Sequence, residues 1–232
     1  MSNRSIYLIS NARLGSSRLE QKMVKPLWDG TTLFELLLVR MNKLNKAFPF
    51  KGCAIALHED DKSLVRLAEQ SGIDVILRSE KSVKSAALCD IYDYTELLGG
   101  DHFMWVNGSA PFWEPDTAAR AARLFAASPH MTSLTSVVKR KNWFWDYETS
   151  EAITCPDSGG ATQDSKPILE STHSFHIFPK REVLDFNRYW GFFRQDPYLF
   201  EIDSSECVAD VDNQEDFDVA DALMMWRGLK RE

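Results

Sequence analysis

The chain has 232 residues, 44% of them hydrophobic and 26% charged, which excludes a disordered, collagen-like or disulfide-stapled protein and indicates a folded globular domain. It carries 27 Lys and Arg against 34 Asp and Glu, so its formal net charge is -7. Because binding to a nucleic-acid backbone requires a basic face, this charge argues against a nucleic-acid partner.

Cysteine usage and hydropathy bear on localisation. The four cysteines (Cys53, Cys89, Cys155 and Cys207) lie far apart and none forms a C-x-x-C pair, which favours reduced thiols in a cytosol. The N-terminal apolar stretch is too short for a secretory signal, and charged residues break the longest apolar windows. We therefore expect a cytoplasmic protein with no membrane partner.

Strands and helices are predicted to alternate through the first two thirds of the chain. Apolar runs predict strands at 6–10, 53–57, 73–77, 103–106 and 132–138. Helices are predicted from a capping box at 32–35 to about 48, from Asp60 or Asp61 to Gly72, over 85–98, and from Asp116 to about 128. This rhythm predicts an α/β fold with a mainly parallel, Rossmann-like sheet covered by helices on both faces.

Residues 139–166 interrupt this rhythm, and an aromatic cluster lies within them: Trp143, Phe144, Trp145 and Tyr147. We interpret the segment as an arm or hairpin inserted in a single domain spanning 1–232. Exposed aromatic side chains need a partner surface, and a second copy of the chain is the simplest one, so a homodimer is expected.

The core is predicted to resume after the arm. Strands are expected at 173–178 and 198–202, and helices near 179–189 and over 212–227. His173 and His176 would point to opposite faces of an extended strand, which disfavours a metal-binding pair.

A basic loop follows the first predicted strand. From residue 11 to residue 25 it holds four bases and one acid, a local charge of +3 in an acidic chain. Ligands of open α/β sheets bind beyond the carboxyl ends of the strands, where this loop must lie. Gly15 would let the backbone approach an anion and Ser16 would add a donor, so a polyphosphate is a good candidate ligand. A basic surface loop is the alternative.

An acidic stretch lies near the other end of the chain, with nine acids and no base from residue 201 to residue 221. Asp210 and Asp212 flank Val211 just before the last predicted helix, and alternate residues of an extended segment face the same side. Two adjacent carboxylates repel unless a cation lies between them, and Mg²⁺ is bound by such oxygens together with substrate phosphates. We therefore predict a Mg²⁺ site, although a solvated acidic face would explain the other acids.

Four motifs carry a family resemblance: 12–22 (ARLGSSRLEQK), 106–112 (VNGSAPF), 162–163 (TQ) and 210–217 (DVDNQEDF). In this order they resemble the cytidylyltransferases that activate 2-keto-3-deoxy sugar acids, above all the acylneuraminate cytidylyltransferase (CMP-sialic acid synthetase) family. The resemblance extends from residue 6 to about residue 225. It implies that CTP reacts with a keto-sugar acid, sialic acid or a related nonulosonate, to give a CMP-sugar and pyrophosphate.

The resemblance also implies roles for individual residues. Arg13, Lys22 and Asp212 are the candidate catalytic residues, and Asp210 and Asp212 would hold Mg²⁺. The implied nucleotide-binding residues are Ala12, Arg13, Gly15, Ser16, Lys22 and Arg78, and the implied sugar-binding residues are Asn107, Ser109 and Gln163.

The chain departs from the family pattern at two places. Glu20 and Gln21 stand where the family usually has Pro-Gly. The absence of an acid after the fourth strand differs from the related Kdo-activating enzymes and matches the acylneuraminate branch. Thr162 stands where many family members have an arginine for the sugar carboxylate, so Lys139, Arg140 or Lys141 would have to neutralise it, or the substrate differs. A non-catalytic nucleotide-sugar binder and a nucleotidyltransferase for another sugar or nucleotide remain the alternatives.

Overall fold

The computed structural model describes residues 4–15, 18–155 and 160–228. Seven strands form one sheet in the order β3-β2-β1-β4-β6-β5-β7. The strands are β1 (Ile6–Asn11), β2 (Cys53–His58), β3 (Asp74–Arg78), β4 (His102–Val106), β5 (Leu134–Arg140), β6 (Ile168–Pro179) and β7 (Tyr198–Glu201).

The sheet is mainly parallel, because β6 alone among these strands runs antiparallel to its neighbours, β4 and β5. The helices are α1 (Leu33–Ala47), α2 (Lys62–Ser71), α3 (Glu80–Lys84), α4 (Leu88–Ile91), α5 (Pro115–Ala127), α6 (Lys180–Phe186) and α7 (Gln214–Arg227). Three short 3-10 helices, η1 (Asp93–Leu97), η2 (Thr162–Asp164) and η3 (Ser204–Glu206), complete the elements of the described residues.

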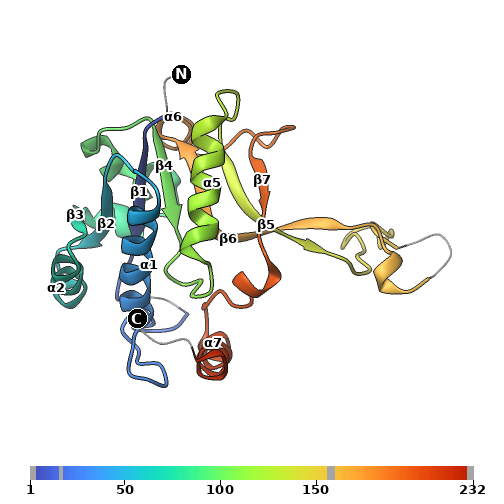
Figure 1. The fold of residues 1–232 in the computed structure, drawn as a ribbon, viewed down its shortest axis with the longest axis horizontal. Helices are drawn as coiled ribbons and strands as arrows, with labels where there is room; N and C mark the ends of the chain where they lie inside the picture. Colours follow the sequence, from blue (N-terminus) through green and yellow to red (C-terminus); the bar gives the residue numbers. More distant parts are fainter. Residues whose placement is uncertain (1–3, 16–17, 156–159, 229–232) are drawn as a thin grey trace.

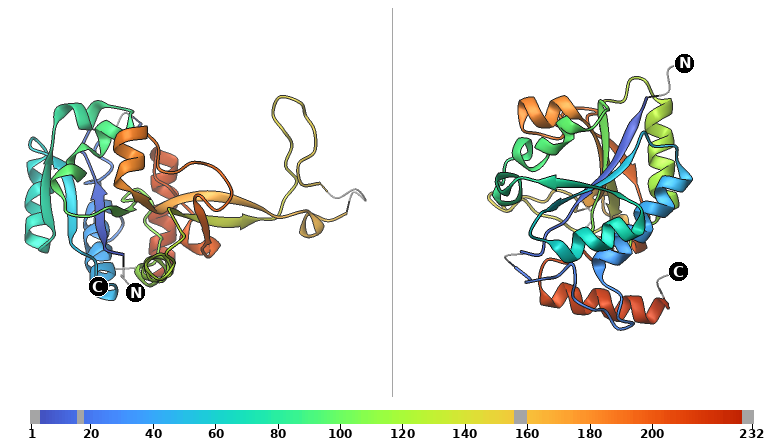
Figure 2. Two further views of the ribbon diagram at one scale, coloured as in Figure 1. Left: turned by 90° about the horizontal axis from the view of Figure 1, so that it is seen from above. Right: turned by 90° about the vertical axis from the view of Figure 1, so that its left-hand side faces the viewer.

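Helices cover both faces of the sheet, as the sequence predicts. The larger core packs α1, α2 and α5 against one face and also includes residues of α7, which lies across the end of the sheet; the smaller core packs η1 and α6 against the other face (Figures 1 and 2). The predicted α/β fold with a mainly parallel sheet is therefore confirmed. Among the described residues, no helix is long and apolar enough to cross a membrane.

Local sequence signals fix the ends of several helices. Thr32 and Glu35 form the expected capping box of α1, and Gly72 ends α2 in the left-handed conformation at φ 77°. The last helix also begins with a capping box, which Asn213 and Asp216 form. Asp61 occupies the cap position of α2 without a capping hydrogen bond, and its carboxylate instead accepts the backbone N–H of Leu14 at 3.3 Å.

The predicted helix over 85–98 is wrong. The chain forms two short pieces there, α4 and η1, and the short helix α3 lies just before them. Ser79 caps α3 by accepting the N–H of Ser82, and Ser85 is extended with its hydroxyl bonded to Asp90 at 2.9 Å. Serine side chains compete in this way with helical hydrogen bonds. Consequently Ser82 and Ser85 reach the carboxyl edge of the sheet.

The arm leaves the sheet as a two-stranded ribbon of β5 and β6 (Figures 1 and 2). The pairing of β5 with β7 ends at Val137, whereas its pairing with β6 continues to Arg140. The connection beyond Arg140 contains the aromatic cluster, of which Trp143, Trp145 and Tyr147 are exposed, Tyr147 to 99%.

A bulge in β6 corrects the expectation for the two histidines. The register between β5 and β6 shifts after Thr135, and His173 adopts a left-handed φ of 50°. The alternation of side chains is therefore broken, and His173 Nδ1 lies 3.4 Å from His176 Nε2 instead of on the opposite face. His176 is buried, and burial lowers its pKa to about 3, so it is a neutral structural residue.

Candidate functional site

A cavity of about 270 Å³ opens at the carboxyl edge of the sheet, where β1, β3 and β4 end. Residues from the basic loop, from the segment after β3 and from the segment after β4 line it: Asn11, Ala12, Arg13, Arg18, Lys22, Met23, Arg78, Ser82, Val83, Ser85, Ile91, Trp105, Asn107 and Ser109. The cavity thus lies where open α/β sheets bind their ligands.

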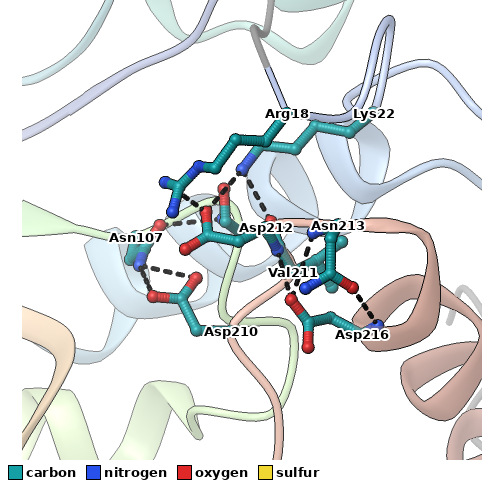
Figure 3. A network of polar contacts seen from close by, with 9 residues as sticks. Arg18, Lys22, Asn107, Asp210, Val211, Asp212, Asn213 and Asp216 are labelled. Atoms are coloured by element: carbon teal, nitrogen blue, oxygen red, sulfur yellow. Dashed lines mark hydrogen bonds and ion pairs between the residues drawn. The ribbon is translucent and has the colours of Figure 1, made fainter.

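The basic loop and the acidic segment meet beside this cavity (Figure 3). Lys22 Nζ donates to the carbonyl of Val211 at 2.6 Å and lies 3.4 Å from Asp212 Oδ1. Arg18 forms a second ion pair with the same carboxylate oxygen at 2.8 Å. Ion pairs at the site therefore connect the basic loop to the acidic segment, about 190 residues further along the chain.

Asp210 and Asp212 face the same side, as their spacing predicts, because Val211 between them is fully buried and its N–H donates to Ser109 at 2.8 Å. Although the side chain of Asp210 is exposed, the surrounding protein reduces its hydration, and this raises the pKa of its carboxyl. The charge of Asp212 raises this pKa further, whereas Lys22 and His173 lower it.

Asn107 connects the end of β4 to the acidic pair. Its Nδ2 lies 3.4 Å from Asp210 Oδ1, its Oδ1 accepts the N–H of Ser109 at 2.8 Å, and its carbonyl accepts the indole N–H of Trp113 at 3.0 Å. The Asn107 side chain is therefore fixed between β4 and the segment before α7 (Figure 3).

Arg78, at the end of β3, lies at the other end of the cavity. It is buried, and its guanidinium donates to the hydroxyl of Ser82 at 3.1 Å and to the carbonyl of Ser82 at 2.5 Å. Burial lowers the pKa of Arg78 from its high normal value, and the nearby Arg13 contributes to the lowering. Arg13 itself donates to the carbonyl of Val83.

A divalent cation would find two carboxylates here. In the described part of the chain, no group of three or more His, Cys, Asp and Glu side chains could hold a metal ion. Asp210 and Asp212 offer hard oxygen ligands. Reduced hydration is the main cause of the raised pKa of Asp210, and the second cause is the charge of Asp212, a repulsion that a cation would relieve. The pair fits Mg²⁺, which takes one or two carboxylates and completes its shell with phosphate oxygens and water.

Eight of the eleven predicted site residues lie at the cavity or beside it: Ala12, Arg13, Lys22, Arg78, Asn107, Ser109, Asp210 and Asp212. Gly15 is described but does not line the cavity, and a Cβ there would meet no atom of the described residues within 4 Å. Ser16 lies outside the described residues. Gln163 lies in η2 on the arm, where its carbonyl accepts from Lys141 at 2.9 Å, away from the cavity of its own chain.

The three bases considered for a sugar carboxylate are already engaged by the chain. Lys139 pairs with Glu201 at 3.6 Å and Arg140 with Glu170 at 2.6 Å, while Lys141 bonds Gln163. None of the three lines the cavity.

Arg18 is expected only as one of the four bases of the loop, and no role at the site is predicted for Asn11, Ser82, Ser85 and Trp105. Asn11 follows the predicted first strand directly and Trp105 lies within the predicted fourth, so the rule that ligands bind at strand ends could have identified both. The sequence does not indicate Ser82 and Ser85, because the predicted helix over 85–98 leaves Ser82 in a connection and places Ser85 at a helix end, whereas both residues line the cavity.

Comparison with solved structures identifies the class of fold. The CMP:2-keto-3-deoxy-manno-octonic acid synthetase solved in complex with CTP matches 96% of this chain and 99% of its own, with a TM-score of 0.70 at 13% identity. A cytidylyltransferase from Leptospira borgpetersenii matches 96% of this chain and 87% of its own, with a TM-score of 0.60 at 16% identity. The chain therefore has the α/β fold of these nucleotidyltransferases.

Two further matches agree on this fold. The 4-diphosphocytidyl-2C-methyl-D-erythritol synthase from Anaerococcus prevotii matches 96% of this chain and 97% of its own, with a TM-score of 0.63 at 12% identity. A nucleotidyl transferase from Methanothermobacter thermautotrophicus matches 96% and 99%, with a TM-score of 0.58 at 14% identity. At such identities the likeness establishes the architecture.

At the level of sequence, no family model matches the chain. A stretch of 103 residues, 44% of the chain, is 32% identical to an uncharacterised protein of Methanocaldococcus jannaschii. The match spans 40% of the length of that relative.

Proposed function

We propose that this protein is a cytidylyltransferase that transfers CMP from CTP to a 2-keto-3-deoxy sugar acid, a sialic acid or related nonulosonate, and releases pyrophosphate. The observation that carries the proposal is the junction of Arg18 and Lys22 with Asp212, beside Asp210, at the carboxyl edge of the sheet. Cations for a polyphosphate and carboxylates for its metal thus meet in one place. Cytidylyltransferases of the same fold, one of them complexed with CTP, support the choice of nucleotide.

In this proposal the anomeric hydroxyl of the sugar acid attacks the α-phosphorus of CTP, and the bond from that phosphorus to the bridging oxygen of pyrophosphate breaks. Lys22 and Arg13 stabilise the negative charge that passes to the leaving pyrophosphate. Asn107 and Ser109 hold the sugar acid beside the α-phosphate, so that positioning supplies much of the rate acceleration.

Asp210 and Asp212 would hold Mg²⁺ bound to the nucleotide. When bound there, the ion neutralises phosphate charge and acts as a Lewis acid on the phosphoryl oxygens. Lys22 and Arg18 would then exchange part of their contact with Asp212 for contact with the phosphates, because all of these groups surround the same carboxylate.

The proposal is tested by measuring pyrophosphate release with each of CTP, UTP, ATP and GTP against a panel of keto-sugar acids. We expect release with CTP and a 2-keto-3-deoxy acid and with no other nucleotide at a comparable rate. Tight CTP binding without release would favour the non-catalytic binder. Release with another nucleotide, or with an aldose phosphate instead of a sugar acid, would favour the other nucleotidyltransferases.

The arm adds a prediction about assembly, since Trp143, Trp145 and Tyr147 expose apolar surface that water solvates poorly. We propose that a second copy covers this surface in a homodimer and that Gln163 of each arm serves the partner's site. Replacing Trp143 and Trp145 by Ser should shift the mass in light scattering from dimer to monomer and reduce pyrophosphate release. A wild-type protein that is monomeric at micromolar concentration would contradict the prediction.

A further inference from the structure

Asn11 and Trp105 form a hydrogen-bonded pair in the wall of the cavity that the roles above leave unused. Trp105 Nε1 donates to Asn11 Oδ1 at 2.6 Å. An indole N–H is a donor only, so it fixes which end of the Asn11 amide faces Trp105. The amide nitrogen, Nδ2, must therefore point elsewhere, and both residues line the cavity.

The orientation of Trp105 is itself fixed by a contact with the buried side chain of His176. Its ring stacks on His176 with the centroids 5.4 Å apart and the planes 13° from parallel. His176 is buried, and its Nδ1 is 2.8 Å from the hydroxyl of Thr135. A chain of contacts from Thr135 to Asn11 thus holds the amide in one orientation before any ligand binds, which is the arrangement that lowers the entropic cost of recognition.

The Asn11 amide nitrogen has a free donor. Within residues 4–15, 18–155 and 160–228, no protein atom accepts a hydrogen bond from Nδ2. A donor that is held in place at a cavity wall without a protein acceptor is available to a ligand oxygen.

The sheet order decides which part of a nucleotide meets this donor. Along the carboxyl edge, β1 lies between β3, which ends at Arg78, and β4, which Asn107 follows. The basic loop and Asp212 mark the phosphate end beside Asn107. At the end of the cavity near Arg78, the segment with Ser82, Val83 and Ile91 offers a mixed polar and apolar surface. Such a surface suits the nucleobase of the nucleotide. The ribose, which joins base to phosphates, then lies against Asn11.

We propose that Asn11 is a specificity-determining residue whose Nδ2 donates to a ribose hydroxyl of the nucleotide, and that Trp105 is a positioning residue that orients the Asn11 amide. This inference rests on the proposed function, because it takes the ligand of the cavity to be a ribonucleoside triphosphate. It predicts that one side chain lets the protein distinguish CTP from the analogue that lacks the bound ribose hydroxyl.

The test compares binding of CTP, 2′-deoxy-CTP and 3′-deoxy-CTP by calorimetry, with Mg²⁺ and without sugar acid. We expect the wild type to bind CTP about tenfold more tightly than one of the two deoxy analogues, as loss of one hydrogen bond to a fixed donor implies. Asn11→Leu should weaken CTP binding about tenfold and bring this ratio close to one. Trp105→Phe keeps the stacked ring but frees the amide, so the ratio should fall to an intermediate value.

Asn42→Leu is the matched control, since Asn42 donates to Ser71 at 3.0 Å on the α1 side of the molecule and should leave the ratio unchanged. A wild type that binds CTP and both analogues equally would overturn the inference, as would an Asn11→Leu variant that keeps the wild-type ratio. If the wild type prefers another ribonucleoside triphosphate, the choice of CTP is wrong, and the same ratio measured with that nucleotide still decides on Asn11. Binding of no triphosphate would contradict both proposals.

Discussion

Lys22→Ala and Arg13→Ala should each reduce the turnover of pyrophosphate release by about a hundredfold or more. Each substitution removes a positive charge from the place where the leaving pyrophosphate gains negative charge, and one such donor is worth about a hundredfold in other enzymes. Lys22 touches Asp212 and the carbonyl of Val211, and Arg13 reaches the carbonyl of Val83, so both side chains are held at the cavity. The measurement is the initial rate at saturating CTP and sugar acid.

Lys25→Ala is the control for both variants. Lys25 belongs to the same basic loop, but it bonds Gln214, lies 4.8 Å from the centre of the Phe217 ring and does not line the cavity. If the loss of turnover in the Lys22 and Arg13 variants depends on their position at the cavity and not on the net charge of the loop, loss of the Lys25 charge should change turnover less than about threefold. Near-normal turnover of a folded Lys22→Ala or Arg13→Ala variant would contradict the assignment of that residue.

The elements that the sequence predicts best are those whose local signals agree with their burial. The capping box at Thr32 and the left-handed glycine at Gly72 mark the ends of α1 and α2, where the structure has them. The apolar runs that become β1, β2 and β4 are buried on both faces, so their hydrophobicity is continuous and easily found. These strands and their order along the chain are sufficient to predict that the site lies at the carboxyl edge of the sheet.

Elements that depend on tertiary contacts were predicted less well. The segment from Ser79 to Leu98 has residues that a helix tolerates, but serine hydroxyls and the buried Arg78 side chain bind its backbone and divide it. The bulge at His173 depends on pairing with β5, which is distant in the sequence. The contact between Trp105 and Asn11 joins residues of two strands that lie 94 positions apart in the sequence, so no local sequence pattern predicts it.

Asp210→Asn and Asp212→Asn should both raise the Mg²⁺ concentration needed for half-maximal rate and lower turnover. Each substitution keeps the shape of the side chain and removes one negative charge from the proposed metal site. Asp212 also holds Lys22 and Arg18 by ion pairs, so its loss should affect apparent CTP affinity as well, whereas loss of Asp210 should affect mainly the metal dependence.

The folded state should tolerate both changes. The pKa of Asp210 is raised in the folded protein, so its ionised form costs stability above the unfolded pKa, and Asp210→Asn should be at least as stable as the wild type at pH 7. Asp212 is partly exposed, and loss of its ion pairs should cost no more than about 1 kcal/mol. Thermal unfolding without Mg²⁺ or nucleotide would detect a larger loss.

Glu215→Gln and Asp218→Asn are the controls for the metal site, because both acids lie in α7 and contact neither Lys22 nor Arg18. Asp218 accepts a hydrogen bond from Gln214 at 2.5 Å, within the same helix. Initial rates measured against Mg²⁺ concentration for all four variants separate two explanations. A shift confined to the Asp210 and Asp212 variants would support a defined metal site between β4 and α7. Equal shifts in the controls would mean that the nine acids from residue 201 to residue 221 act together as a diffuse negative field, since such a field depends on the number of charges and little on their positions.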